Sequence, residues 1–420
     1  MIDLSAMTQT ARQAAHELAI MTRDRKDEAL MGLADLLESH TDMVLKANAA
    51  DIALAGKIGL TSAVIDRLRL TKAGLLALAE DVRKVAQLPD PVGLVFDRKT
   101  LANGLRVHKQ RVPLGVLAVI YESRPNVTVD VSSLALNSGN AVILRGGKET
   151  LNSNRALFEL IQGALNTSDL PLGAVQWIDS SDRDLVLSLI QMSDMVDMLI
   201  PRGGAGLHDF CREHSRIPVM TGGIGICHLF VDASADLEAA LNIIHNAKTQ
   251  RPSVCNALDT LLIHKDIADE FVAKLINHLQ EVDFRLDPGA FACLQEHTIN
   301  TDRVRPAGDG DFDIEWLSLV LGVKVVADLQ EAMAHIRAHS TGHSDGILTR
   351  DEENANRFVS QVDSAAVYVN ASTRFTDGGQ LGLGAEVAIS TQRLHARGPM
   401  ALEELTTYKW VILGENQVRE

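Results

Sequence analysis

The sequence predicts an α/β protein with two doubly wound domains and a small β module. Short apolar runs alternate with amphipathic stretches from residue 115 to residue 370, which is the rhythm of parallel strands separated by helices. The chain of 420 residues is also too long for one hydrophobic core. Its aromatic content is only 4%, so Leu, Val, Ile and Ala must form the interior.

The N-terminal part is predicted to be a helical layer followed by a hairpin. Residues 5–87 carry apolar side chains at three- and four-residue spacing, with charged residues between them. The Pro- and Gly-containing residues 88–93 end this layer. Residues 94–112 then predict two short strands about the turn at Asn103 and Gly104. The hairpin has no core of its own, so we expect it to pack on another subunit.

Two α/β segments follow, and the change between them is predicted near residue 232. The first has apolar runs at GVLAVIY, AVILRG, AVQWI and VDMLIP, and the second at CHLFVDAS, TLLIHK, VKVVAD, GILTR and AAVYVN. Amphipathic stretches such as NSNRALFELIQGAL and DIADEFVAKLINHLQ separate these runs. The predicted division is residues 1–93 and 113–231 for one domain, 232–390 for the other, and 94–112 with 391–420 for the β module.

Charge and composition exclude several classes of function. The net charge of -15 repels a polyanion, so neither a nucleic acid nor an acidic membrane is expected as the main partner. No apolar run approaches the roughly 18 residues that span a bilayer, and the N-terminus lacks a secretory signal, so we expect a cytoplasmic enzyme. The four cysteines are widely spaced and no HExxH-like pair occurs, so neither disulfides nor a metal site are expected.

Cys255 stands alone between a polar run and an apolar strand, in AKTQRPSVCNALDTLLIH. A lone cysteine is more often a small buried hydrophobe than a reactive group. Lys248 and Arg251 closely precede it, and such cations would favour the thiolate that a nucleophile requires. Cys255 is therefore a candidate nucleophile whose surroundings must decide between the two interpretations.

Two strand exits predict a site for a phosphate-bearing cofactor. VDMLIPRGGAGLHDF, residues 196–210, predicts a strand, a Gly-rich turn and a helix whose free N–H groups could bind a dinucleotide phosphate; the alternative is a simple turn. AVILRGGKET places Arg145 and Lys148 after a buried strand, where they suit the 2′-phosphate of NADP; the alternative is a solvated loop. The candidate cofactor ligands of the first stretch are Arg202, Gly203, Gly204 and Gly206.

Asn126 is a candidate donor to an oxyanion. It follows Pro125 in YESRPNVTVD, directly after the strand GVLAVI, and a fixed amide there could donate to the developing charge. Asn is also common in ordinary turns, which is the alternative.

Four long stretches make the chain similar to a known family. VPLGVLAVIYESRPNVTVDVSSLALNSGNAVILRGGKET, NAKTQRPSVCNALDTLLIH, STRFTDGGQLGLGAEVAIS and LHARGPMALEELTTYKW resemble the γ-glutamyl phosphate reductases, also called glutamate-5-semialdehyde dehydrogenases. This family belongs to the aldehyde dehydrogenase superfamily. The resemblance implies an aldehyde dehydrogenase-like fold and NADPH-dependent reduction of L-glutamate 5-phosphate to L-glutamate 5-semialdehyde and phosphate, the second step of proline biosynthesis.

The resemblance also implies roles for individual residues. Cys255 matches the superfamily nucleophile, and Asn126 matches its oxyanion-binding amide. Glu315, in DIEWLSLVLGVKVV, falls where the superfamily holds the nicotinamide ribose, and Arg145 falls where a lysine lies near the adenosine ribose. The first domain is thereby expected to bind the cofactor, the second to hold the nucleophile, and the β module to join subunits of a homo-oligomer.

One departure bears on the chemistry. Hydrolytic aldehyde dehydrogenases carry a water-activating Glu where this chain reads VMTGGIG, residues 219–225, without a carboxylate. The substrate brings an α-carboxylate and a phosphate to an acidic protein, so local cations are needed. Arg124, Arg251 and Arg374 are the candidates, with ordinary salt bridges as the alternative. A functional coupling to glutamate 5-kinase is also expected.

Three other hypotheses remain. The chain could be a related aldehyde or acyl-phosphate dehydrogenase with another substrate, which a comparison of aldehydes with and without phosphate would separate. It could also be a dinucleotide-binding or scaffold protein with an unreactive Cys255. A papain-like hydrolase fits worst, since nothing around Cys255 supplies that family's signature.

Overall fold

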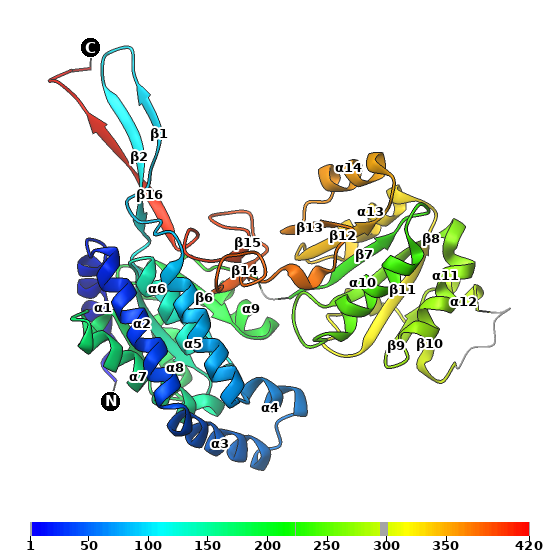
Figure 1. Ribbon diagram of the computed structural model, residues 1–420, viewed down its shortest axis with the longest axis horizontal. Coiled ribbons are helices and arrows are strands. Elements are labelled where there is room, and N and C mark those ends of the chain that lie inside the picture. Colours follow the sequence, from blue (N-terminus) through cyan, green and yellow to red (C-terminus); the bar gives the residue numbers. More distant parts are fainter. Residues whose placement is uncertain (1, 223, 295–300, 420) are drawn as a thin grey trace. The chain divides into compact units, whose positions relative to one another are not determined.

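The computed structural model describes residues 2–222, 224–294 and 301–419, and the chain divides into two compact units. Unit 1 comprises residues 1–221, 378–388 and 399–420, and unit 2 comprises residues 222–377 and 389–398. Both are α/β units with parallel sheets, which confirms the predicted fold class (Figure 1). No helix among the described residues is both long and apolar enough to cross a membrane.

Unit 1 begins with the predicted helical layer. Its five helices are α1 (Leu4–Leu18), α2 (Arg23–Ser39), α3 (Thr41–Lys57), α4 (Ser62–Leu68) and α5 (Lys72–Gln87). Helix α2 packs against α5 and also against α7 (Leu151–Thr167), so the layer joins the α/β part of the unit. The fully buried Lys26 of α2 reaches Asp90 at 2.6 Å and the Asn137 carbonyl at 2.7 Å, which satisfies its charge inside the unit.

A four-stranded parallel sheet forms the centre of unit 1. Its order is β5 (Val175–Trp177), β4 (Ala141–Gly146), β3 (Val116–Tyr121) and β6 (Met198–Arg202). Strands β3 and β4 are buried along their whole length, as their continuous apolar runs predict. The remaining helices are α6 (Val127–Asn137), α8 (Arg183–Leu189) and α9 (Ala205–His214). The strand order reverses between β3 and β6, and ligands of such sheets bind at that point.

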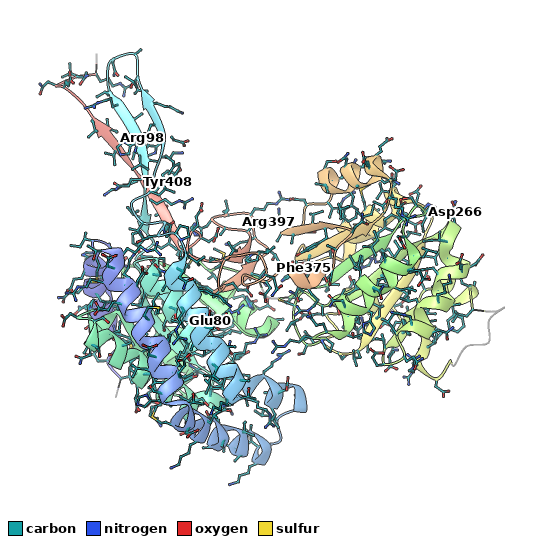
Figure 2. The ribbon with its side chains drawn as sticks, in the orientation of Figure 1. Glu80, Arg98, Asp266, Phe375, Arg397 and Tyr408 are labelled. Atoms are coloured by element: carbon teal, nitrogen blue, oxygen red, sulfur yellow. The ribbon has the colours of Figure 1, made fainter. Side chains whose placement is uncertain are left out.

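Three strands of unit 1 form a separate antiparallel sheet. β2 (Arg106–Pro113) pairs with β1 (Val95–Thr100) on one side and with β16 (Thr406–Leu413) on the other. Gly104 adopts φ 84° in the turn between β1 and β2, which confirms the predicted hairpin. Tyr408 of β16 and Arg98 of β1 lie on this sheet (Figure 2).

Unit 2 is built on a seven-stranded parallel sheet. The strand order is β10 (Val304–Pro306), β9 (Asp283–Leu286), β11 (Val320–Val326), β8 (Leu258–His264), β7 (Cys227–Val231), β12 (Ser344–Leu348) and β13 (Ala366–Val369). The helices are α10 (Leu237–Thr249), α11 (Lys265–His278), α12 (Pro288–Ala292), α13 (Leu329–His339) and α14 (Glu352–Gln361). A core of buried Leu, Val, Ile and Phe side chains packs β8 and β11 against α10 and α11.

The boundary between the units differs from the predicted one. Strand β7 pairs with β8 and β12, so residues 222–231 belong to unit 2 and the division falls before β7. Residues 378–388 return to unit 1, although the sequence predicted them in the second domain. Both differences arise from pairing between distant segments, which the local hydrophobic pattern does not encode. The short strands β14 (Ala388–Ser390) and β15 (Gly398–Met400) pair where the chain passes between the units.

Candidate active site

The segments that enter four strands of unit 2 meet at the amino edge of its sheet. The strands stand in the order β11, β8, β7 and β12 (Figure 1), and all are parallel. Glu315 precedes β11, Cys255 precedes β8, Gly225 precedes β7 and His343 precedes β12. Neighbouring parallel strands present the same end at one edge, so these residues gather there despite their distance in sequence.

Cys255 lies in a tight turn at this edge and not inside the hydrophobic core. The Ala257 N–H donates to the Val254 carbonyl at 3.0 Å and closes the turn around Cys255 and Asn256. Cys255 itself is half-buried, whereas Asn256 is buried and donates from Nδ2 to the Thr376 carbonyl at 2.9 Å. The nucleophile candidate is therefore accessible and its supporting turn is fixed.

Arg374 is the cation whose charge interacts with Cys255. It lies in the short 3-10 helix η5 (Thr373–Phe375), and its Nε donates to Gln250 Oε1 at 3.0 Å while its guanidinium also contacts Asn256 Oδ1. Burial lowers the pKa of Arg374, and the positive charge of Arg251 lowers it as well. The negative charges of Asp377 and of the Cys255 thiolate act to raise this pKa. The charge of Arg374 therefore favours negative charge at Cys255, and its role as a substrate ligand stays a prediction.

Lys248 does not have the role that its position in the sequence predicted. It lies in the last turn of α10, is fully buried, and its Nζ lies 3.4 Å from Asp259 Oδ1. Burial lowers the pKa of Lys248 and raises the pKa of Asp259 to about 6. The lysine therefore forms an internal pair under the sheet edge, whereas the charge of Arg374 interacts with that of Cys255.

Glu315 is connected to the nucleophile segment through Gly225. Its Oε1 accepts the Gly225 N–H at 2.9 Å, and the next residue, Trp316, donates its N–H to Asp259 Oδ1 at 3.2 Å. A Cβ at Gly225 would lie 1.6 Å from the Cys255 carbonyl oxygen, so only glycine permits this contact. The structure therefore brings Glu315 to the segment that adjoins the Cys255 carbonyl, and its role at the nicotinamide ribose stays a prediction. The sequence did not indicate Asp259 as a functional residue, because its contacts with Lys248 and Trp316 depend on the folded structure.

In unit 1, Arg145 and Arg202 lie at the ends of β4 and β6, the two strands that flank β3. Tyr121 at the end of β3 pairs with Arg202 of β6 and with Gly146 of β4, so Arg145 and Arg202 share the carboxyl edge. Arg145 is only 9% exposed, and one of its NH₂ groups donates to the Ser181 carbonyl at 3.2 Å. The Nε atoms of Arg145 and Arg202 are buried and have no hydrogen-bond partner among the described residues.

The Gly-rich turn between β6 and α9 leaves room beside its backbone. A Cβ at Gly204 or Gly206 would meet nothing within 4 Å, so packing inside the chain does not require these glycines. The Gly204 N–H donates to Oε2 of the exposed Glu122 at 3.1 Å. A bound phosphate would compete with Glu122 for this donor. Sequence analysis missed this acidic neighbour, since β3 and β6 are distant in the chain.

Asn126 begins helix α6 and its amide is held in place. Its Nδ2 donates to Asp130 Oδ2 at 2.9 Å, one turn along the helix. Burial raises the pKa of Asp130 to about 7, although the hydrogen bond from Asn126 acts to lower it. Arg124 belongs to the same turn, where its carbonyl accepts the Val127 N–H at 3.1 Å.

The predicted site residues divide between the two units. Cys255, Glu315, Arg251 and Arg374 belong to unit 2, and Asn126, Arg124, Arg145, Lys148, Arg202, Gly203, Gly204 and Gly206 to unit 1. Within the part of the chain that the structure describes, no cluster of three or more His, Cys, Asp or Glu side chains could hold a metal ion. Gly223, in the stretch without a carboxylate, lies outside the described residues.

Comparisons with known proteins place the chain in a family. The model of the aldehyde dehydrogenase family matches residues 2–290. A γ-glutamyl phosphate reductase of Psychromonas ingrahamii is 56% identical over 418 residues and covers 100% of both chains. The crystal structure of γ-glutamyl phosphate reductase from Thermotoga maritima is 44% identical, covers 100% of both chains and has a TM-score of 0.94.

A more distant structure shares the fold alone. An engineered glycolyl-CoA reductase with bound NADP+ is 16% identical and has a TM-score of 0.72. The match covers 98% of this chain and 96% of that chain. The match to the aldehyde dehydrogenase family supports a nicotinamide cofactor. The resemblance seen in the sequence is thereby confirmed, and the chain belongs to the aldehyde dehydrogenase family, within its γ-glutamyl phosphate reductase branch.

Proposed function

We propose that this chain reduces L-glutamate 5-phosphate to L-glutamate 5-semialdehyde and phosphate through a thioester on Cys255, with NADPH as the reductant. This is the second step of proline biosynthesis, and the relatives named above carry the name of this reaction. The observation that carries the mechanism is the half-buried Cys255 in a fixed turn, whose next residue, Asn256, contacts the Arg374 guanidinium.

In this mechanism the Cys255 thiolate attacks the γ-acyl carbon of the substrate. A carbon–sulfur bond forms, the acyl–phosphate bond breaks, and phosphate leaves with the electron pair. Arg374 supports the ionised sulfur, because a cation beside a thiol favours the thiolate. The thiohemiacetal formed on reduction then returns the sulfur as a thiolate and releases the aldehyde.

We assign Asn126 and the Cys255 N–H to the oxyanion of the tetrahedral species. One such donor typically lowers the barrier by about 3 to 4 kcal/mol. The hydrogen bond to Asp130 supports this assignment for Asn126, because a preorganised amide needs no reorientation when charge develops. The stretch from Val219 to Gly225 contains no carboxylate, so a base that would hydrolyse the thioester is missing from its expected place.

We assign the cofactor to the carboxyl edge of the unit 1 sheet and to Glu315. The buried and unpartnered Nε atoms of Arg145 and Arg202 and the open backbone at Gly204 fit an anionic ligand. Lys148 is exposed in the turn after β4, which supports a preference for the 2′-phosphate of NADP. When bound, the reduced nicotinamide supplies the hydride for the thioester. Gly203 and Gly206 complete the assigned cofactor ligands.

The substrate anions are assigned to the three arginines. Arg251 lies close enough to Arg374 in unit 2 for its positive charge to lower the pKa of Arg374, and the two guanidinium groups suit a phosphate or carboxylate. Arg124 adjoins Asn126 in unit 1. The cytoplasm as location and a coupling to glutamate 5-kinase follow from the biosynthetic role and belong to this proposal.

We further propose that residues 94–112 and 391–420 join subunits of a homo-oligomer. On β16, Tyr408, Trp410 and Ile412 alternate along the strand and are 47%, 54% and 61% exposed. Alternate residues of a strand share a face, so the three side chains form one exposed apolar surface. Surfaces of this kind mark sites of protein association.

Steady-state oxidation of glutamate 5-semialdehyde by NADP with phosphate tests the proposed function. The wild type should require phosphate, prefer this aldehyde to simple aldehydes and prefer NADP to NAD, and Cys255→Ser should abolish the activity. Equal rates with simple aldehydes would favour the related dehydrogenase, and full activity of Cys255→Ser would remove the nucleophile assignment.

A further inference from the structure

A second cysteine, Cys227, lies directly beneath the nucleophile segment. It is the first residue of β7 and is 0% exposed. Its Sγ lies 3.2 Å from the backbone carbonyl oxygen of Cys255 and donates to it. The proposed mechanism assigns no role to this thiol.

The Cys227 sulfur stays protonated and acts as a donor. Burial raises the pKa of Cys227 well above its ordinary value, and the nearby carboxylates of Asp345 and Asp259 act in the same direction. A neutral thiol is a weak hydrogen-bond donor and a poor nucleophile. Cys227 is thus suited to hold a carbonyl group and unsuited to attack a substrate.

Two hydrogen bonds hold Asn256, the residue that follows Cys255 in the turn. Thr373 Oγ1 donates to the Asn256 carbonyl at 2.7 Å, and the Asn256 amide holds the Thr376 carbonyl at 2.9 Å. On the side of β7, Gly225 approaches the Cys255 carbonyl so closely that a Cβ would overlap it. The peptide between Cys255 and Asn256 is therefore confined by Gly225 and directed by the Cys227 thiol.

The thiol is in turn surrounded by polar groups that limit its orientation. His343 Nδ1 lies 3.9 Å from Cys227 Sγ and 2.9 Å from Ser344 Oγ. Ser344 Oγ lies 2.7 Å from Thr376 Oγ1, and Thr376 also receives the Asn256 amide through its carbonyl. These contacts link the thiol back to the turn that holds Cys255.

We propose that Cys227 is a positioning residue for the nucleophile, which it orients by donating its S–H to the Cys255 carbonyl. Rotation of that peptide changes ψ of Cys255 and thus the direction of its side chain. An error of about 1 Å in such a group can cost on the order of a hundredfold in rate. This inference rests on the proposed function, because it assumes that Cys255 attacks the substrate.

Replacement of Cys227 by Val, Ala and Ser tests the inference. Cys227→Val removes the donor and adds one heavy atom, Cys227→Ala removes the donor and the sulfur, and Cys227→Ser keeps a donor. We expect the Val variant to lower kcat about tenfold with KM nearly unchanged, since a misdirected nucleophile slows the step without weakening binding. The Ser variant should keep most of kcat, and Cys255 alkylation by iodoacetamide should slow in parallel with kcat.

Cys293→Ala is the matched control, because the Cys293 thiol also donates to a backbone carbonyl, that of Gly289 at 3.3 Å. It should leave kcat and alkylation of Cys255 unchanged. Equal loss of kcat in the Ser and Val variants would overturn the positioning role, as would wild-type kcat in the Val variant. If Val cannot be accommodated, Cys227→Ala with serine as its rescue decides the same question. An active Cys255→Ser variant would instead remove the proposed function itself.

Discussion

The positive charge that favours the Cys255 thiolate comes from Arg374, which is distant from Cys255 in the sequence. Arg374 is anchored by Gln250 and Asn256, which flank the nucleophile in sequence, so the cation and the thiol share one support. Burial lowers the pKa of Arg374, but an arginine remains protonated at neutral pH. Arg374 is therefore a fixed positive charge at the turn that carries Cys255.

Arg374→Gln should slow the alkylation of Cys255 at pH 7 by about tenfold, since less of the thiol ionises without the adjacent cation. The rate is measured with iodoacetamide and peptide mass spectrometry. Arg251→Gln is the matched control, and its effect should be smaller because Arg251 is exposed. An unchanged rate in Arg374→Gln would contradict the electrostatic role.

Asp130 should make the free energy of unfolding decrease as the pH rises. Its pKa is raised by burial to about 7 from an ordinary 3.8, so its contribution is complete below the ordinary value and is lost as pH rises through about 7. Each unit of pKa corresponds to about 1.4 kcal/mol, so the loss can reach about 4 kcal/mol. Asp81, Arg202 and Glu386 modify the shift by smaller amounts.

Asp130→Asn should keep an acceptor for Asn126 and remove this loss. The urea midpoint of the variant should exceed that of the wild type at pH 8.5, with a much smaller difference at pH 5. The same difference at both pH values would show that Asp130 does not titrate in this range.

At the scale of elements, the site depends on the loops before β7, β8, β11 and β12. The sequence predicted most strands and helices, because hydrophobic periodicity is local. It did not predict the pair of Lys248 and Asp259, the contact of Gly225 with Cys255 or the approach of Arg374. These contacts join segments that only the strand order brings together, whereas Cys255 was identified through a long family-specific stretch and Glu315 through its place in DIEWLSLVLGVKVV.

Gly225→Ala tests this edge of the sheet. The added Cβ would overlap the Cys255 carbonyl, so the turn must shift and kcat should fall by about a hundredfold or more. Gly32→Ala is the control: a Cβ there meets nothing within 4 Å, and alanine in helix α2 should stabilise the protein by about 0.5 to 1 kcal/mol. Retained activity in Gly225→Ala would contradict the described contact.

Lys148→Gln tests the carboxyl edge of the unit 1 sheet. Loss of this exposed cation should raise KM for NADP by about tenfold and leave KM for NAD nearly unchanged, because only NADP carries the 2′-phosphate. Kinetics with both cofactors measure the ratio. An equal rise in KM for both cofactors would show that Lys148 does not recognise the 2′-phosphate.

At the scale of the whole molecule, the small β sheet has an apolar face that the chain itself leaves uncovered. Lys109 Nζ lies 4.6 Å from the Tyr408 ring centre and 5.2 Å from that of Trp410, so the face combines aromatic rings with a cation. An acidic chain with a net charge of -15 resists nonspecific association, which makes a specific contact on this face the simplest explanation for its exposure.

Trp410→Glu should dissociate the proposed homo-oligomer, since it places a charge in the middle of the proposed contact. Light scattering coupled to size-exclusion chromatography measures the mass. Lys409→Glu, on the opposite face of the same strand, should leave the mass unchanged. A wild type that is already monomeric, or equal effects of both variants, would contradict the assignment.

The central claim is that Cys255 carries the acyl group, and a single-turnover experiment without phosphate tests it most directly. With glutamate 5-semialdehyde and NADP, the wild type should release NADPH in a burst stoichiometric with the enzyme, and a γ-glutamyl adduct should appear on the peptide that contains Cys255. Phosphate should then remove the adduct and restore turnover. A burst without this adduct, or a burst in Cys255→Ser, would contradict the account.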